Sequence, residues 1–228
     1  MFKLVLIKME CKKCKLKCIK KGFNKTTQRW FCKSCKHHFQ EQYIYHICSR
    51  EDEVMIFRLH NEGVGINGIG RLLGMCKSNV VNKIKHIATQ IVKPKIVEEQ
   101  QEYEVDEMYT FIKCKAQQCY ITYAINKSTK RVIDFVVGGR TKENLGKVIA
   151  SLYELYPKKI FTDKLNIYSS LIDKTIHRAN AYKINHIERF NLTLRTHLKR
   201  LSRRTICFSK SKEMLENCLR IYLWGLSS

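Results

Sequence analysis

Apolar residues recur at helical spacing in one part of the chain and at strand spacing in another. Between residues 51 and 92 they return every three or four positions, which is the period of an amphipathic helix. From residue 103 onward, runs rich in aromatic and β-branched residues predict strands over 103–112, 120–125 and 132–137. Pro94 and the acidic stretch 98–104 separate the two patterns and predict a linker.

The remaining pattern predicts alternating helices and strands. A helix follows the third strand and ends before Pro157. Short strands are expected over 159–162 and 175–182, and helices over 185–201 and 210–223. In the helix that ends before Pro157, the apolar face is expected to comprise Leu145, Val148, Ile149, Leu152 and Tyr156. The order of elements predicts an α/β domain with a mixed sheet flanked by helices, preceded by a helical segment.

Charge changes this picture, because 43 Lys and Arg face only 20 Asp and Glu, for a formal net charge of +23. Such an excess attracts polyanions, and nucleic acid is the leading candidate. The alternative is a soluble basic protein with no specific partner. The basic residues concentrate in 1–50 and 174–212, whereas acidic residues collect in 98–107.

Cysteine usage indicates a metal site. Eleven Cys are an odd number, and no secretory signal or membrane-length apolar run accompanies them, so we expect a reducing cytoplasm and no membrane partner. Two CxxC pairs, Cys11/Cys14 and Cys32/Cys35, stand 17 residues apart. Four thiolates in this spacing predict a zinc ribbon whose zinc is structural. Competing ligands are Cys18, His37 and His38, and most other Cys are expected to be small buried side chains.

Residues 66–73, the turn at 74–76 and a helix from 77 to 88 have the proportions of a helix-turn-helix. The alternative is an ordinary helical hairpin with a solvated polar face. The second helix buries one stripe and presents side chains of the types that contact phosphates and base edges. These expected DNA-binding residues are Lys77, Asn79, Asn82, Lys83 and His86.

Three carboxylates stand out by position. Asp106 lies in the first strand, Asp163 ends the fourth, and Glu188 lies in the first turn of the long basic helix. The element order is that of the ribonuclease H-like fold, in which such carboxylates converge on two divalent metal ions. Each acid taken alone is more commonly a surface carboxylate. On the helix, Glu188, Asn191 and Arg195 form one polar stripe, opposite an apolar one.

Three segments carry a family resemblance. IERFNLTLRTHLKRL over 187–201, continuing to TICFSKS over 205–211, resembles the C-terminal signature of insertion-sequence-one family transposases. VDEMYTF over 105–111 resembles that family's first catalytic strand, and Thr162-Asp163 its second. The ribbon and helix-turn-helix are similar to the family's N-terminal half in order and spacing. The resemblance covers about residues 10–224.

The resemblance implies a transposase that binds terminal inverted repeats, then cuts and joins strands. Asp106 and Asp163 would hold Mg²⁺ or Mn²⁺, and Glu188 would complete the site. Arg189, Asn191 and Arg195 would contact DNA or the carboxylates. Its partners would be double-stranded DNA, as inverted repeats and target, and further copies of the chain, in a nucleoid-associated cytoplasmic assembly. The expected domains are a zinc ribbon (1–47), a helix-turn-helix DNA-binding domain (48–94) and a ribonuclease H-like catalytic domain (95–228).

The chain also departs from the family pattern. Lys164 follows Asp163 where the family usually has Gly, and a Lys at this position competes with a metal unless it points away. Two alternatives therefore stay open. One is a DNA-binding repressor of the same element that has lost catalysis. The other is a ribonuclease H-like nuclease that acts on another substrate, such as branched DNA.

Overall fold

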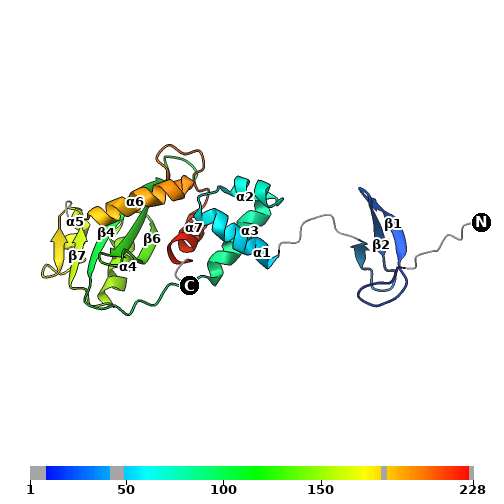
Figure 1. Ribbon diagram of the computed structural model, residues 1–228, viewed down its shortest axis with the longest axis horizontal. Coiled ribbons are helices and arrows are strands. Elements are labelled where there is room, and N and C mark those ends of the chain that lie inside the picture. The colour runs from blue at the N-terminus through cyan, green and yellow to red at the C-terminus, as the bar shows by residue number, and fades with distance from the viewer. Residues whose placement is uncertain (1–8, 42–48, 181–183, 226–228) are drawn as a thin grey trace, which may run out of the picture. The chain divides into compact units, whose positions relative to one another are not determined.

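The computed structural model describes residues 9–41, 49–180 and 184–225, which belong to two compact units, Met1–Cys48 and Ser49–Ser228 (Figure 1). The first unit is a three-stranded antiparallel sheet of β1 (Ile19–Asn24), β2 (Thr27–Phe31) and β3 (His38–Gln40). Trp30 and Phe39 lie opposite each other on β2 and β3 and are buried. Two large apolar side chains make a small core, so this unit depends on further cross-links.

The second unit begins with three helices, α1 (Arg50–Asn61), α2 (Ile66–Leu72) and α3 (Lys77–Gln90). The hydroxyl of Ser49 accepts a hydrogen bond from the N–H of Asp52, and the Asp52 carboxylate accepts one from the N–H of Ser49, which starts α1 with a capping box. The turn from α2 to α3 needs glycine, because a Cβ at Gly70 would lie 2.7 Å from the carbonyl oxygen of Met75. The buried residues of the three helices include Ile56, Ile69, Val80 and Ile84.

A mixed five-stranded sheet follows, in the order β6-β5-β4-β7-β8. Strands β4, β5 and β6 form an antiparallel meander, while β7 and β8 run parallel to β4. The bounds are β4 (Glu102–Phe111), β5 (Gln118–Asn126), β6 (Val132–Gly138), β7 (Lys159–Thr162) and β8 (His177–Ala179). The predicted α/β class with a mixed sheet is therefore confirmed.

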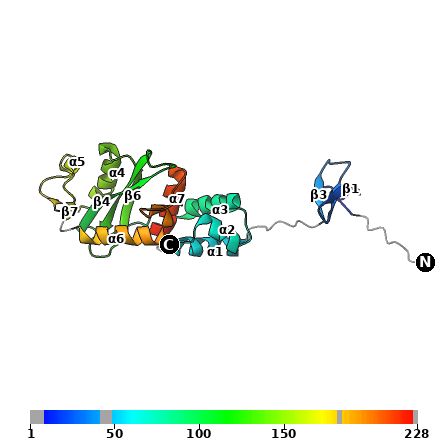
Figure 2. The ribbon, with the colours of Figure 1, turned by 90° about the horizontal axis from the view of Figure 1, so that it is seen from above.

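Helices cover both faces of this sheet. α4 (Lys142–Tyr153) and α6 (Asn185–His197) lie on opposite sides, as Figure 2 shows, and a single turn, α5 (Asn166–Ser169), follows β7. α7 (Lys212–Trp224) follows the 3₁₀ turn η2 (Lys199–Leu201). Alternate residues of β4 enter different cores: Val105 packs in the cluster that contains α4, and Met108 in the cluster that contains α6 and α7. The sheet is thus buried on both faces.

Several sequence-based expectations were wrong in detail. Glu102 already begins β4, so the second half of the predicted linker is strand. α4 ends at Tyr153, and Tyr156 lies beyond it with a φ of 49° and 68% of its surface exposed, so it is not part of the apolar face. The long helix ends at His197, because Leu198 adopts extended backbone angles before η2. Of the fifth predicted strand, residues 181–182 lie outside the described part of the chain.

The scattered cysteines also differ from expectation. Cys119 and Cys218 are buried as predicted, while three others are exposed. Cys48 lies outside the described residues. The exposed ones are Cys76, Cys114 and Cys207.

Among the described residues, no helix is long and apolar enough to span a bilayer.

Candidate metal centres

The four predicted sulfur ligands meet in the first unit. The Sγ atoms of Cys11, Cys14, Cys32 and Cys35 all lie within 4.8 Å of one another. Cys11 and Cys35 are 3.5 Å apart at sulfur, and Cys14 and Cys32 are 3.4 Å apart. These distances are far too long for disulfides, and they approach the separation of about 3.8 Å that a tetrahedral zinc with Zn–S bonds of about 2.3 Å imposes. The donor set and its size therefore fit a four-coordinate zinc.

Of the competing ligands, the two His rings pack elsewhere, whereas Cys18 adjoins the cluster beside Cys11 and Cys32 without being one of its four members. The ring of His38 packs on Phe31, and the ring of His37 stacks on Phe39. The Cys18 thiol is directed at the carbonyl oxygen of Leu16, and burial raises its pKa to about 11. By contrast, the backbone N–H of Cys14 lowers the pKa of Cys11 to about 6, which favours the thiolate that a metal binds.

In the second unit, the strand register brings Asp106 and Asp163 together. β4 and β7 are parallel, with Glu104 opposite Phe161. Two residues further along each strand are Asp106 and Asp163, which therefore stand level although their pairing has ended at Glu104. The N–H of Leu165 donates to Oδ1 of Asp163 at 2.9 Å and orients it. The two carboxylates thus lie level, Asp163 just after the end of β7 and Asp106 on β4 where its pairing with β7 has ended, and the end of a parallel strand is a common position for a ligand site in α/β proteins.

A third carboxylate, Glu107, completes this group. One oxygen each from Asp106, Glu107 and Asp163 lie within 4.8 Å of one another. The side chain of Glu107 is buried, and Tyr168 donates a hydrogen bond to it. Hard oxygen donors in such a cluster fit a divalent cation of the Mg²⁺ or Mn²⁺ kind. The sequence pattern did not select Glu107, because neighbouring residues of a strand face opposite sides.

The cation that the structure places among these acids is Arg140, from the segment between β6 and α4. Its guanidinium donates to Oε2 of Glu107 from Nη2 at 2.8 Å and from Nε at 3.1 Å, and it approaches Oδ2 of Asp163 at 3.3 Å. Burial alone would lower the pKa of Arg140, but its bonds to Glu107 and the nearby charge of Asp163 raise it. Lys164 is exposed and forms no ion pair in the described part of the chain, so Arg140 is the cation beside Asp163.

Helix α6 holds Asp106 from the other side. The amide of Asn191 donates to Oδ2 of Asp106 at 2.8 Å, and the hydroxyl of Tyr123 donates to the Asn191 oxygen at 2.8 Å. The predicted polar stripe of this helix therefore reaches the site through Asn191. Burial raises the pKa values of Asp106 and Glu107, and the charge of Asp163 adds to both shifts. A group of acids that costs free energy to ionise favours cation binding.

A second contact fixes the start of α6. Glu104 is fully buried, and its carboxylate accepts from the N–H of Ile187 at 2.9 Å and lies 2.6 Å from Nδ1 of His186. Glu104 lies two residues before Asp106 on β4, so one strand contacts both the first turn and the middle of α6. The sequence did contain a signal for this contact, namely a charged residue inside an apolar strand. A carboxylate that is buried in such a strand needs hydrogen-bonding partners.

Glu188 lies on the first turn of α6, where the sequence predicted it, and is exposed. Among the described residues, the cluster of possible metal ligands contains Asp106, Glu107 and Asp163 and does not include Glu188. Arg189 is exposed beside it. The structure thus brings together Asp106, Asp163 and Glu107, with Glu188 one helical turn from the Asn191 that bonds Asp106.

On α3, four of the five predicted DNA-binding residues are exposed, namely Lys77, Asn79, Asn82 and His86. The fifth, Lys83, is half-buried and faces α1. Nζ of Lys83 lies 2.7 Å from Oε1 of Glu53, and Nδ1 of His86 lies 3.4 Å from the same oxygen. The polar face of α3 is therefore partly used in packing the helices together.

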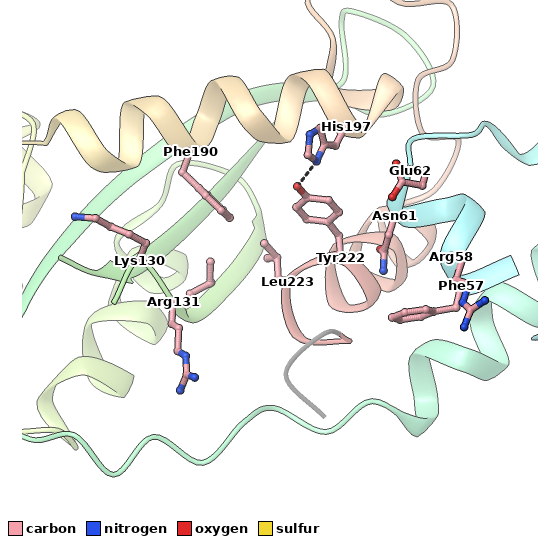
Figure 3. Close-up of a pocket in the computed structure, with 11 residues that line it drawn as sticks. Phe57, Arg58, Asn61, Glu62, Lys130, Arg131, Phe190, His197, Tyr222 and Leu223 are labelled. Atoms are coloured by element: carbon pink, nitrogen blue, oxygen red, sulfur yellow. Dashed lines mark hydrogen bonds between the residues drawn. The ribbon is translucent and has the colours of Figure 1, made fainter. Parts of the chain in front are cut away.

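A cavity of about 650 Å³ lies away from the carboxylates, between α1, the β5–β6 turn, α6 and α7 (Figure 3). Its rim carries Arg58 and Arg131, and its wall includes the pair His197–Tyr222, joined by a 2.6 Å hydrogen bond. None of the carboxylates described above lines this cavity.

Comparison with known proteins gives consistent results. Residues 102–225 match a family described as IS1 transposase. Insertion element iso-IS1n protein InsB of Shigella dysenteriae is 36% identical over 120 residues, which are 53% of this chain and 92% of that protein. Insertion element IS1 4 protein InsB of Escherichia coli (strain K12) is 33% identical over 120 residues, 53% of this chain and 72% of that protein.

Among solved structures, a chain of the simian T-cell lymphotropic virus intasome in complex with PP2A regulatory subunit B56 gamma is 16% identical, with a TM-score of 0.37 over 72% of this chain and 67% of that one. This likeness is too distant to carry an argument.

Proposed function

The chain belongs to the family of IS1 transposases, and we propose that it binds the terminal inverted repeats of an insertion sequence and catalyses metal-dependent DNA strand cleavage and strand transfer. The observation that carries this proposal is the level placement of Asp106 on β4 and Asp163 just after β7, two parallel strands, with Glu107 beside them. A polynucleotidyl transferase needs such acids to hold divalent cations at a phosphodiester.

We assign Asp106 and Asp163 as the ligands of Mg²⁺ or Mn²⁺, and Glu188 as the third acid of the catalytic set. Glu188 lies about 4.5 Å along the helix from Asn191, since each residue rises about 1.5 Å, and Asn191 already contacts Asp106. Bound there, the cations would polarise the phosphodiester and activate the attacking hydroxyl or water.

The other side chains position this set. Asn191 orients the Asp106 carboxylate, and Tyr168 holds Glu107 in place. Arg140 balances the acids by contacting Glu107 and Asp163. Because Arg140 is 36% exposed, it can also turn toward a phosphate while the acids hold the cations.

DNA binding is assigned to the first unit and to α3. The four-Cys cluster would hold a structural zinc, since its four ligands leave no position for water. The exposed Lys77, Asn79, Asn82 and His86 would contact DNA, together with Lys83, whose Nζ also pairs with Glu53. Arg189 and Arg195 on α6 would contact the DNA near the carboxylates, and the charge of +23 favours this partner.

Joining two element ends requires two catalytic sites, so we propose an assembly of at least two chains. Its location would be the nucleoid of the cytoplasm, where its DNA lies. These assignments rest on the chemistry of strand transfer.

The test is strand cleavage and joining on duplexes that carry the element's ends, with Mg²⁺ present and omitted. Asp106→Asn and Asp163→Asn should each lower the rate about 1,000-fold or more, which corresponds to roughly 4 kcal/mol of activation free energy. The matched control is Asp173→Asn, an exposed acid whose pKa is lowered by Thr175 and which lies outside the carboxylate group. This control should keep wild-type activity.

Two outcomes would overturn the catalytic assignment. If the wild type and both variants cut equally little while still binding the inverted repeats, the chain is a binding protein that regulates its element. If the wild type cuts branched DNA but not DNA with these ends, the chain is a nuclease of other specificity.

A further inference from the structure

A smaller cavity, of about 360 Å³, lies where the end of β4 faces the segment from α6 through η2. Three arginines line it, Arg195, Arg200 and Arg203. Two aromatic residues of β4, Tyr109 and Phe111, form its other wall. We call this cavity the arginine pocket. Its residues are separate from the carboxylates of the metal centre.

The arginine pocket carries positive charge without a balancing acid. Within the described ranges, no ion pair joins Arg195, Arg200 or Arg203 to a carboxylate. Arg200 donates to the hydroxyl of Ser209 at 3.0 Å, which leaves its charge uncompensated. Burial lowers the pKa of Arg195, and the charge of Arg203 lowers it further. Like charges held together in a concave site attract an anion.

The aromatic side chains of the pocket indicate which class of anion it binds. Tyr109 is 42% exposed, and its ring meets that of Tyr120 edge-on at 5.7 Å. Phe111 is held by a ring contact of 5.3 Å with Phe208. Phe111 is half-buried, so Tyr109 is the exposed ring of the pocket. An exposed aromatic ring beside guanidinium groups is typical of sites for unpaired nucleotides, in which a base stacks on the ring and phosphates contact Arg. Bases inside an intact duplex are not available for such stacking.

The place of the pocket relates it to the metal centre. Arg195 is one turn after Asn191 on α6, about 6 Å along the helix axis, and Asn191 contacts Asp106. Tyr109 is three residues after Asp106 on β4, about 10 Å along the strand. Adjacent nucleotides of one strand rise about 3.4 Å, so the pocket lies roughly two to three nucleotides from the carboxylates.

We propose that the arginine pocket binds an unpaired stretch of DNA strand, two to three nucleotides from the phosphodiester held at Asp106 and Asp163. The inference rests on the proposed function. It specifies that the DNA bound near the metal centre is unpaired, which the proposed function leaves open. The DNA would therefore be locally unpaired at the element end when it is cut, with its phosphates on the guanidinium groups and a base on Tyr109.

The experiment compares two labelled duplexes of equal base-paired length, one blunt and one with a three-nucleotide single-stranded extension. Binding to the zinc-loaded full chain is measured by fluorescence anisotropy without added Mg²⁺, so that no cleavage occurs. The wild type should prefer the extended DNA. Arg200→Gln and Arg203→Gln should each weaken its binding about tenfold and lower the slope of log K against log salt by about 0.7, as expected for one lost single-strand phosphate contact.

Matched variants separate charge from stacking. Arg131→Gln removes the same charge at the other cavity and should leave the preference intact (Figure 3). Tyr109→Leu should abolish the preference without changing the salt slope, and Tyr109→Phe should restore it. Arg203 is exposed, so its variant keeps the test valid even if Arg200→Gln misfolds.

If the variants at Arg200 and Arg203 bind both duplexes as the wild type does, the arginine pocket proposal is wrong. It is also wrong if the wild type shows no preference for the extension. Cleavage with the Asp106→Asn control is measured separately. A wild type that prefers the extension but never cuts would overturn the proposed function and leave the pocket in place.

Discussion

The two metal centres of this chain are built in opposite ways. The sulfur cluster takes its ligands from two short turns, each of which contributes two Cys three residues apart. The carboxylate group takes Asp106 from β4 and Asp163 from the residue after β7, and it brings in Arg140 from a third segment. One site is local, in a unit whose apolar core is small. The other lies at the edge of a larger, independently packed fold.

This difference indicates which interactions stabilise each unit. The first unit buries few large side chains, so bound metal supplies much of its folding free energy. In the second unit, two hydrophobic clusters support the sheet. The acids lower the stability of this unit when they are ionised, because burial raises the pKa values of Asp106 and Glu107. Removing metal should therefore unfold one unit and barely affect the other.

The largest effect is expected for Cys32→Ser. Cys32 is fully buried in the sulfur cluster, and structural zinc contributes roughly 10–16 kcal/mol in small zinc domains. The variant should lose its zinc and the fold of residues 9–41, measured by metal content and limited proteolysis, while the second unit keeps its thermal transition. Cys18→Ser is the control and should keep zinc. A first unit that stays folded without zinc would show that its stability does not depend on the metal.

Arg140→Gln tests whether the carboxylate group depends on its internal cation. Without Mg²⁺ the change leaves Glu107 and Asp163 uncompensated, and the free energy of unfolding of the second unit should fall by about 2 kcal/mol, after a discount for the partial exposure of Arg140.

Saturating Mg²⁺ should then raise the Tm of this variant more than that of the wild type, because the cation replaces the lost charge. Arg131→Gln is the control and should show the wild-type rise. Equal rises in Arg140→Gln and wild type would show that Arg140 and the cation do not share a site.

Glu104→Gln tests how far β4 positions α6. The buried carboxylate contacts both His186 and the N–H of Ile187, so its loss should cost about 1–2 kcal/mol. Amide hydrogen exchange in the first turn of α6 should accelerate. Glu102, two residues earlier on β4, is half-buried and pairs with Lys127 and Lys159, so Glu102→Gln should leave that exchange unchanged. Unaltered protection in Glu104→Gln would mean that apolar packing alone holds the helix.

The smallest effect is expected for Glu53→Gln, which removes the pair with Lys83 between α1 and α3. A hydrogen bond from Lys83 holds the pKa of Glu53 below its usual value of 4.5, so the pair stabilises the fold above that pH and the contribution is lost as pH falls through the lowered pKa. The variant should be about 0.5 kcal/mol less stable than wild type at pH 7.

Denaturant titrations of Glu53→Gln at pH 7 and at acid pH, down to about pH 3, check this sign, because the difference from wild type should shrink as the pH falls through the lowered pKa of Glu53. Glu99→Gln, an exposed acid on the segment before β4, should match the wild type at both. A difference that persists in acid would assign the effect to packing instead of charge.

The sequence by itself determined the elements and the local site. Apolar periodicity predicted the strands of the sheet and the helices on its faces, because burying one face of each element is the main constraint on such a pattern. The two CxxC turns specified all four sulfur ligands, because ligands three residues apart meet without help from the rest of the fold. Asp106 was found as an acid within the first predicted strand and Asp163 as the acid that ends the fourth.

Only the tertiary structure decided which groups join those two acids. Glu107, Arg140 and Tyr168 reach them through strand pairing and loop paths that no local period encodes. Glu188 was expected among the acids and lies exposed on α6, while Asn191, one turn further, contacts Asp106. The physical reason is that helix and strand periods set which face a residue occupies, whereas the register between strands and the packing of α6 set what that face meets.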